Sequence, residues 1–202
     1  ESHSPGIQQT GPFLNFNPFS SRCCQHNHTQ GWPYFTENLW MATPDNGLAA
    51  VIYAPSNVNA KVGDNTNISI TNKTNYPFSE DLIFNIETDK SDFFPIYFRI
   101  PSWCKNSKIF INGQRTKTQI EAGKFLKIKR EWSNGDIVKL VLPKDISVKK
   151  WEKNHNSVSV NYGPLTFSLN IKERYLEKSS DKTAIGDSRW QEDVDRDEWP
   201  TY

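Results

Sequence analysis

Two adjacent cysteines and two nearby histidines are the side chains of this 202-residue sequence best suited to chemistry: Cys23, Cys24, His26 and His28. Thiolate sulfur and imidazole nitrogen are the ligand types that zinc prefers, and a thiolate beside a cation or a metal is a strong nucleophile. Neighbouring Cα atoms lie about 3.8 Å apart, closer than the roughly 4.4 Å that a disulfide requires. We interpret the pair as two thiols facing one site, or as one thiol facing a site and the other facing the core.

A purely structural role competes with this interpretation. Free cysteine is among the most buried residue types and often only packs. No C-x-x-C pair follows, and Cys104 lies far along the chain, where we expect a core or strand-end position. His26 and His28 share one side of an extended segment, as a metal site needs, but in a loop that enters a helix they would instead hydrogen-bond to the backbone.

Composition excludes some classes of partner. The net charge is +1, so no global field attracts nucleic acid or an anionic membrane. No apolar run approaches the roughly 18 residues of a membrane span. Both ends resemble cuts from a longer protein, whose compartment the three cysteines do not fix. For the parent protein we expect a secreted or periplasmic location.

The segment 32–42 is predicted to form a helix, because Pro33 suits a first turn and Phe35, Leu39 and Ala42 recur at helical spacing. It is apolar on nearly all sides, so we expect it to be buried among other helices, outside this sequence. The cluster of helix-breaking residues at 43–47 would end it.

From Gly47 onward the hydrophobic period changes to two, and turn residues are frequent. Asn112-Gly113 and Asn134-Gly135 are typical of hairpin turns. Many short strands without helices between them predict an antiparallel β-sandwich or barrel. The strands are expected near residues 48–54, 58–62, 66–71, 82–88, 94–100, 108–111, 124–129, 136–142, 146–150 and 157–169. Residues 173–202 are rich in charged side chains and are predicted to be a linker or tail.

Several short motifs in this order resemble glycoside hydrolase family 127 (GH127) and its β-L-arabinofuranosidase-like relatives. They are Cys23-Cys24-x-x-Asn27, the run from Asp45 to Ser56, Thr74-Asn75-Tyr76-Pro77-Phe78, Phe98-Arg99-Ile100-Pro101-Ser102-Trp103, Asn112-Gly113, the run from Arg130 to Asp136, and Tyr162-Gly163-Pro164-Leu165. Gln25 and His26 stand where the family commonly has two prolines.

The resemblance implies an (α/α)6-barrel catalytic domain followed by β-sandwich domains. Residues 1–46 would then end the barrel, 47–172 would form the sandwich, and 173–202 would lead to a further domain. In the family a zinc ion is held by a glutamate and three cysteines, and the first of the adjacent cysteines is the nucleophile. Carried over, Cys23 is the nucleophile of a retaining glycosidase, and Cys23 and Cys24 are metal ligands.

The acid–base glutamate, the ligand glutamate and the third cysteine would lie upstream, so this piece alone is expected to be inactive. His26, His28 and Trp32 are candidate substrate contacts, and the substrate is expected to be an arabinofuranoside or a related plant glycan. The competing hypothesis is a non-catalytic β-sandwich module that binds carbohydrate or braces a neighbouring domain. Stoichiometric zinc that is lost on substitution of Cys24 would favour the hydrolase.

Overall fold

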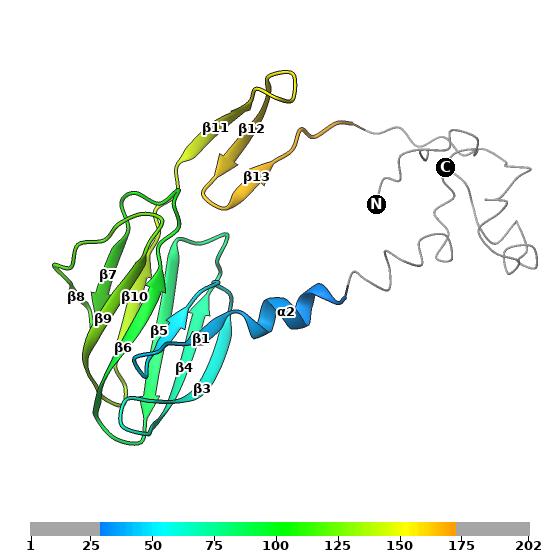
Figure 1. Ribbon diagram of the computed structural model, residues 1–202. Coiled ribbons are helices and arrows are strands. Elements are labelled where there is room, and N and C mark those ends of the chain that lie inside the picture. The colour runs from blue at the N-terminus through cyan, green and yellow to red at the C-terminus, as the bar shows by residue number, and fades with distance from the viewer. Residues whose placement is uncertain (1–28, 173–202) are drawn as a thin grey trace, which may run out of the picture. The chain divides into compact units, whose positions relative to one another are not determined.

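The computed structural model describes residues 29–172, and these residues are mainly β-structure (Figure 1). Within this range one short helix precedes thirteen strands. The elements are α2 (Gly31–Glu37), β1 (Trp40–Ala42), β2 (Leu48–Ala50), β3 (Ser56–Val62), β4 (Thr66–Thr74), β5 (Asp81–Thr88), β6 (Asp92–Arg99), β7 (Lys108–Ile111), β8 (Gln114–Arg115), β9 (Phe125–Trp132), β10 (Ile137–Val141), β11 (Ile146–Trp151), β12 (Ser157–Tyr162) and β13 (Leu165–Phe167).

The strands form three sheets. A four-stranded sheet has the order β1-β2-β6-β9, a six-stranded sheet has the order β3-β4-β5-β10-β7-β8, and a three-stranded sheet has the order β11-β12-β13. Within residues 29–172 every paired set of strands is antiparallel except β2 and β6, which run parallel. The predicted mainly-β, antiparallel fold class is therefore confirmed, with this one parallel pair as an addition.

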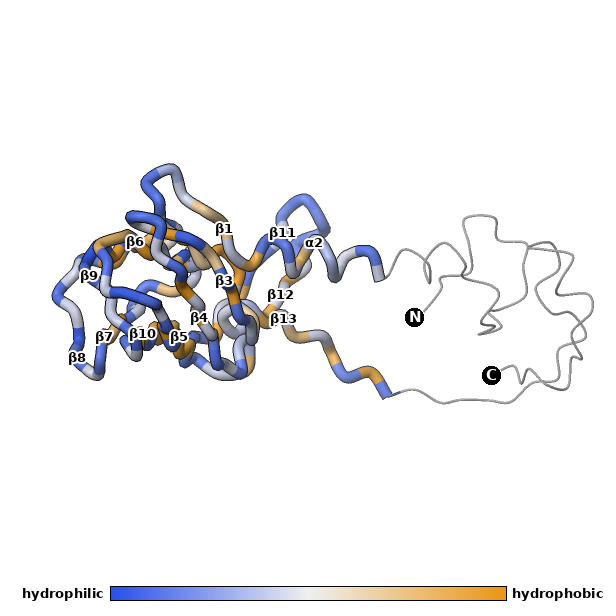
Figure 2. Tube along the Cα trace, turned by 90° about the horizontal axis from the view of Figure 1, so that it is seen from below, coloured by the Kyte–Doolittle hydropathy of each residue, from blue (hydrophilic) through white to orange (hydrophobic). Residues whose placement is uncertain are grey.

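The first two sheets pack face to face as a sandwich, because alternate side chains of their strands point inward. In β5 the inward residues are Leu82, Phe84 and Ile86, each at most 1% exposed. Phe84 meets Phe98 of β6 at 5.1 Å between ring centroids, so the two inner faces are in direct contact. Figure 2 shows hydrophobic residues gathered on the strands and hydrophilic residues on many of the turns between them.

The prediction of a helix over residues 32–42 was wrong in its second half, while its expected burial among helices outside this sequence stays a prediction. The helix ends at Glu37, and none of its residues is buried. Residues 40–42 form β1, in which Trp40 pairs with Ala50. Leu39 is buried in the link between the two. Trp40 packs edge-on against Phe84, so contacts with the sandwich outweigh the local helical spacing.

Only one of the two predicted hairpin turns joins paired strands. Asn112 and Gly113 have φ angles of 50° and 80° and connect β7 to β8, as a tight hairpin requires. Asn134-Gly135 also forms a tight turn, but it passes the chain from β9 in the four-stranded sheet to β10 in the six-stranded sheet. The predicted strand 157–169 is likewise a hairpin, which turns at Gly163 with a φ of 58°.

The three-stranded sheet has one mainly apolar face and one mainly polar face, although Lys150 lies on the first and Trp151 on the second. Directly paired residues share a face, and the pairs Ile146–Tyr162, Val148–Val160 and Val160–Phe167 are all apolar. Ser147, Ser157 and Ser159 lie at the alternate positions on the other face. Ile146 and Val148 remain 73% and 65% exposed.

Candidate functional site

Four of the five predicted site residues lie outside the described part of the chain. Cys23, Cys24, His26 and His28 precede residue 29, so their predicted roles stay predictions. Trp32 lies in α2 and is 62% exposed. Among residues 29–172 no three histidine, cysteine, aspartate or glutamate side chains gather as metal ligands would.

Cys104 is the cysteine that the structure describes, and it is a core residue as predicted. Its side chain is 1% exposed, and its Sγ donates to the Pro143 carbonyl at 3.6 Å. Burial raises the pKa of this thiol to about 11. Because the thiolate is the nucleophilic form, Cys104 is not suited to covalent catalysis near neutral pH.

The motif residues around Asn112 and Asp136 build the turn region between the sheets. The Asn112 side chain donates Nδ2–H to Asp136 Oδ1 at 2.7 Å and accepts the Ile137 N–H at 2.8 Å. Asp136 Oδ2 also accepts the Ser133 N–H at 3.0 Å. The Arg130 guanidinium lies 5.0 Å from the Trp132 ring. The hydrogen bonds of the Asn112 and Asp136 side chains are made within the turn region, so these residues stabilise the fold.

A second group of motif residues fixes the chain around β6. Arg99 donates its Nε–H to the Val51 carbonyl at 2.6 Å, and Tyr53 donates its hydroxyl to the Arg99 carbonyl at 2.7 Å. Burial raises the pKa of Tyr53 far above its usual range, so this hydroxyl stays protonated and remains a donor. The Tyr76 ring stands edge-on to Tyr53, 5.9 Å away. These motif residues are also structural.

Lys144 connects the sandwich to the three-stranded sheet. Its side chain is largely buried, and its Nζ donates to the carbonyls of Pro77 and Phe78, each at 3.0 Å. The same Nζ lies 4.8 Å from the centroid of the Tyr162 ring. A Cβ on Gly163 would come within 2.6 Å of Lys144 Cγ, so the glycine of the Gly163-Pro164-Leu165 motif makes room for this lysine.

An acid–base cluster on the outer face of the four-stranded sheet resembles catalytic machinery in its residue types. Asp45 Oδ2 accepts the Tyr97 hydroxyl at 2.7 Å and the Lys127 Nζ at 2.8 Å, while Thr43 donates to its Oδ1. The Lys127 hydrogen bond, followed by the Thr43 and Tyr97 hydroxyls, lowers the pKa of Asp45 well below its usual range. In turn Asp45 raises the pKa of Lys127 to about 12. Neither group exchanges a proton near neutral pH, so the cluster is not suited to general acid–base catalysis.

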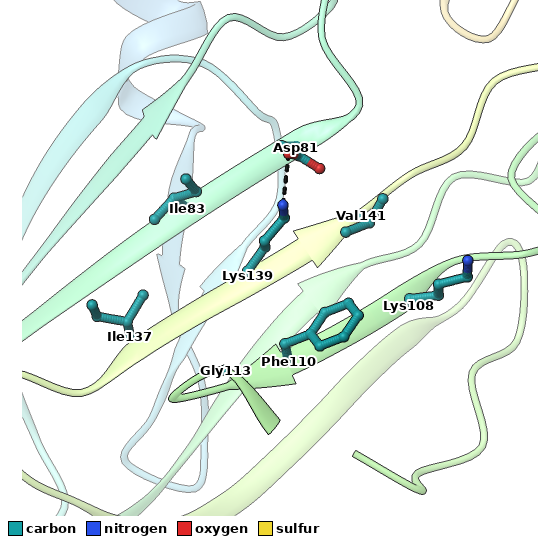
Figure 3. A pocket seen from close by; sticks show the side chains of 8 residues that line it. All are labelled: Asp81, Ile83, Lys108, Phe110, Gly113, Ile137, Lys139 and Val141. Carbon is teal, nitrogen blue, oxygen red and sulfur yellow. Dashed lines mark ion pairs between the residues drawn. The ribbon is translucent and has the colours of Figure 1, made fainter. Parts of the chain in front are cut away.

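An open groove lies on the outer face of the six-stranded sheet (Figure 3). It has a volume of about 520 Å³ over β5, β10 and β7. Its lining residues are Asp81, Ile83, Lys108, Phe110, Gly113, Ile137, Lys139 and Val141. Half of them are apolar side chains that point outward from a sheet whose other face already carries the core.

Strand register places these side chains in rows across the sheet. Lys139 in β10 pairs with Ile83 on one side and with Phe110 on the other. Its Nζ reaches Asp81 Oδ2 at 2.7 Å, and both side chains remain partly exposed. The lysine is thus drawn toward β5 and away from Phe110, as Figure 3 shows. Gly113 has no side chain, and a Cβ there would meet nothing within 4 Å.

Comparison with known proteins identifies a family and solved structures that resemble this chain. Residues 47–144 match the family model described as β-L-arabinofuranosidase, GH127 middle domain. No curated protein matches the chain. A GH127 β-L-arabinofuranosidase from Geobacillus stearothermophilus T6 has a similar structure, with a TM-score of 0.65 and 25% identity over 73% of this chain and 24% of its own.

Two further solved structures share the fold. One is described as a glycoside hydrolase, with a TM-score of 0.66 and 23% identity over 78% of this chain and 27% of its own. The other is a GH127 β-arabinofuranosidase, with a TM-score of 0.55 and 23% identity over 61% of this chain and 22% of its own. The chain therefore spans about a quarter of the length of these relatives.

The fold and these matches define a β-sandwich module of the kind found in glycoside hydrolases. Residues 47–144 are a GH127 middle domain, which confirms the resemblance carried by the sequence motifs.

The groove is the feature that sequence analysis missed. A signal was present, since Leu82, Ile83 and Phe84 are three consecutive apolar residues in a strand. Such a run places apolar side chains on both faces of the sheet. The outward apolar residues of β7 and β10 join Ile83 only through strand pairing, which short-range patterns do not reveal.

Proposed function

We propose that this chain belongs to a retaining glycoside hydrolase that resembles β-L-arabinofuranosidases and uses Cys23 as its nucleophile. The observation that carries the proposal is the match of residues 47–144 to the GH127 middle domain, in a chain whose earlier residues include the Cys23-Cys24 pair. The substrate class is an arabinofuranoside or a related plant glycan. A secreted or periplasmic location would suit such a substrate.

In this proposal the Cys23 sulfur attacks the anomeric carbon, and a carbon–sulfur bond forms as the glycosidic carbon–oxygen bond breaks. A glutamate elsewhere in the longer protein protonates the leaving oxygen and then activates the water that releases the sugar. Cys24 is a zinc ligand beside Cys23, and thiolates are suitable donors for zinc. When bound, zinc would keep these thiols ionised at neutral pH.

The described residues support this division of labour. Within residues 29–172 the motif residues satisfy one another in turns and strand ends, and no cluster of metal ligands is formed. Catalytic groups are therefore expected outside the sandwich. His26, His28 and Trp32 are proposed to contact the substrate, and of these Trp32 is an exposed aromatic side chain in α2.

The test uses the full-length protein with a chromogenic β-L-arabinofuranoside and metal analysis. Cys23→Ala should abolish hydrolysis, and Cys24→Ala should lower the zinc content. Cys104→Ala is the matched control, because this cysteine is buried in the sandwich core and should leave both the metal content and the activity per folded molecule unchanged. Full activity of Cys23→Ala would reject the nucleophile role.

A second candidate function for the sandwich itself is supported by the groove. Non-catalytic β-sandwich modules can bind carbohydrate or brace a neighbouring domain. An apolar groove that carries a few charged groups has the general character of a ligand site.

A further inference from the structure

We propose that the groove on the outer face of the six-stranded sheet binds an acidic saccharide, meaning a sugar ring that bears a carboxylate. This inference rests on the proposed carbohydrate-active function and names a second place where the protein would contact a glycan. The groove residues that carry it are Phe110, Lys108, Lys139 and the neighbouring Arg115.

The size and lining of the groove fit one or two sugar rings. Its volume of about 520 Å³ falls within the range of roughly 300–1,000 Å³ that is usual for small-ligand sites. Ile83, Phe110, Ile137 and Val141 supply an apolar surface, and Lys108, Asp81 and Lys139 supply hydrogen-bonding groups around it. A sugar ring is amphipathic in the same way, because its C–H groups form apolar faces and its hydroxyl groups form a polar rim.

The charges around Phe110 favour an anion. Arg115 pairs directly with Phe110 across β7 and β8, so it lies on the same face of the sheet. Lys139 is the partner of Phe110 on the other side, and Lys108 is two residues away along β7. Asp81 is the acid that lines the groove, and it is already paired with Lys139 at 2.7 Å.

Lys108 and Arg115 are both exposed, and no ion pair engages either of them within residues 29–172. Guanidinium groups bind carboxylates through two parallel hydrogen bonds, which gives an acidic sugar an advantage over a neutral one. The partner predicted by charge complementarity is therefore a uronic-acid type of residue.

The rest of this sheet face argues for a glycan rather than a protein. On β3 and β4 the outward side chains are polar or charged, Lys61 and Lys73 among them, and Asn57 donates to Ser69 and Thr71 at 3.0 and 2.8 Å. The apolar area is thus confined to the groove, whereas stable protein interfaces need a buried core of much greater extent. Hydroxyl and amide groups beside the groove can hydrogen-bond to further sugar residues.

The experiment measures binding to the 202-residue chain with a matched pair of ligands, trigalacturonic acid and its methyl ester. The two ligands have the same rings, but the ester lacks the negative charges. In isothermal titration and ¹H–¹⁵N chemical-shift mapping, the acid should bind with an affinity at least about tenfold higher than that of the ester. Binding of the acid should weaken as salt is added, because the groove charges are exposed.

Three variants test whether the groove residues contribute to binding. Phe110→Ala should weaken binding by about tenfold through loss of the ring surface. Arg115→Gln and Lys108→Gln are surface changes that should lower the preference for the acid while leaving the fold intact. The control is Phe93→Ala combined with Lys129→Gln, an exposed aromatic–lysine pair on the other sheet with 5.5 Å between Nζ and the ring, which should change nothing.

Equal binding of acid and ester, or unchanged binding in Arg115→Gln, would overturn the proposal. Absence of binding to either sugar would also overturn it, and would favour a packing role for this face. The assay requires no hydrolysis, so its result is independent of whether Cys23 is a nucleophile. A full-length protein that is inactive but still binds the acid would refute only the proposed catalytic function.

Discussion

Replacement of Lys144 by methionine tests whether this lysine joins the sandwich to the three-stranded sheet. The side chain is 7% exposed, and its Nζ donates to two carbonyls, those of Pro77 and Phe78, at 3.0 Å each. It also lies 4.8 Å from the Tyr162 ring. Methionine has a similar unbranched stem, so the packing beside Gly163 is kept while the charge and the donors are lost.

The expected cost follows from these contacts. Each hydrogen bond from a charged donor contributes about 1.5–3 kcal/mol, and a partly desolvated cation–π contact contributes about 0.5–2 kcal/mol. Removal of the charge also removes the cost of burying it, which offsets part of this sum. We expect Lys144→Met to lower the free energy of unfolding by about 2–3 kcal/mol, or about 5–10 °C in Tm for a chain of this size.

The measurement is urea unfolding of the 202-residue chain, followed by tryptophan fluorescence. Lys124→Met is the matched control, because Lys124 forms an exposed ion pair with Glu121 at 2.6 Å in which the two side chains are 68% and 51% exposed. Such pairs contribute about 0–1 kcal/mol. If Lys144→Met costs no more than Lys124→Met, the connecting role assigned to Lys144 is wrong.

Three further predictions concern the loop at residues 43–47 and the core thiol. Gly47→Ala should destabilise the sandwich by about 2 kcal/mol or more in urea unfolding, because a Cβ there would lie 2.2 Å from the backbone oxygen of Pro95; a change below about 0.5 kcal/mol would contradict the geometry. The folded state lowers the pKa of Asp45, so its contribution to stability is present above the ordinary carboxyl pKa of about 4 and is lost as the pH falls below it. The difference in unfolding midpoint between wild type and Asp45→Asn should therefore shrink from pH 7 toward pH 3, and a difference that stays constant would contradict this account. Burial raises the pKa of Cys104 to about 11, so iodoacetamide should label this cysteine only after denaturation, as peptide mass spectrometry would show; rapid labelling of the folded chain would refute it.

Alternation of apolar and polar residues predicted the strands of the sandwich well. Phe125, Lys127 and Lys129 point outward and Leu126 and Ile128 inward, as the period of two requires. The pattern is strong here because one face of each strand is buried and the other is solvated. The strand ends differ by a few residues from those predicted, since hydrogen bonding between strands decides where pairing stops.

Long-range pairing explains what the sequence could not reveal. Residues 39–42 have helical spacing, yet Trp40 and Met41 pair with Ala50 and Ala49 in β1 and β2. Asn134-Gly135 has the composition of a hairpin turn, but its flanking strands have better partners in different sheets. The groove is assembled from β5, β10 and β7, which pair directly in that order although β8 and β9 separate β7 from β10 in the sequence.

The motif residues that identify the family have structural roles throughout the described chain. Asn112 and Asp136 bond to each other and to the backbone of the turn. Gly163 makes room for Lys144, and Arg99 ties β6 to the segment before β3. A match to these residues therefore establishes the fold of the module, and under the proposed function catalysis depends on other residues. If Cys23 is the nucleophile, as proposed, a protein could keep every motif within residues 29–172 and lose hydrolysis through a single change at Cys23, and its sandwich would still fold in the same way.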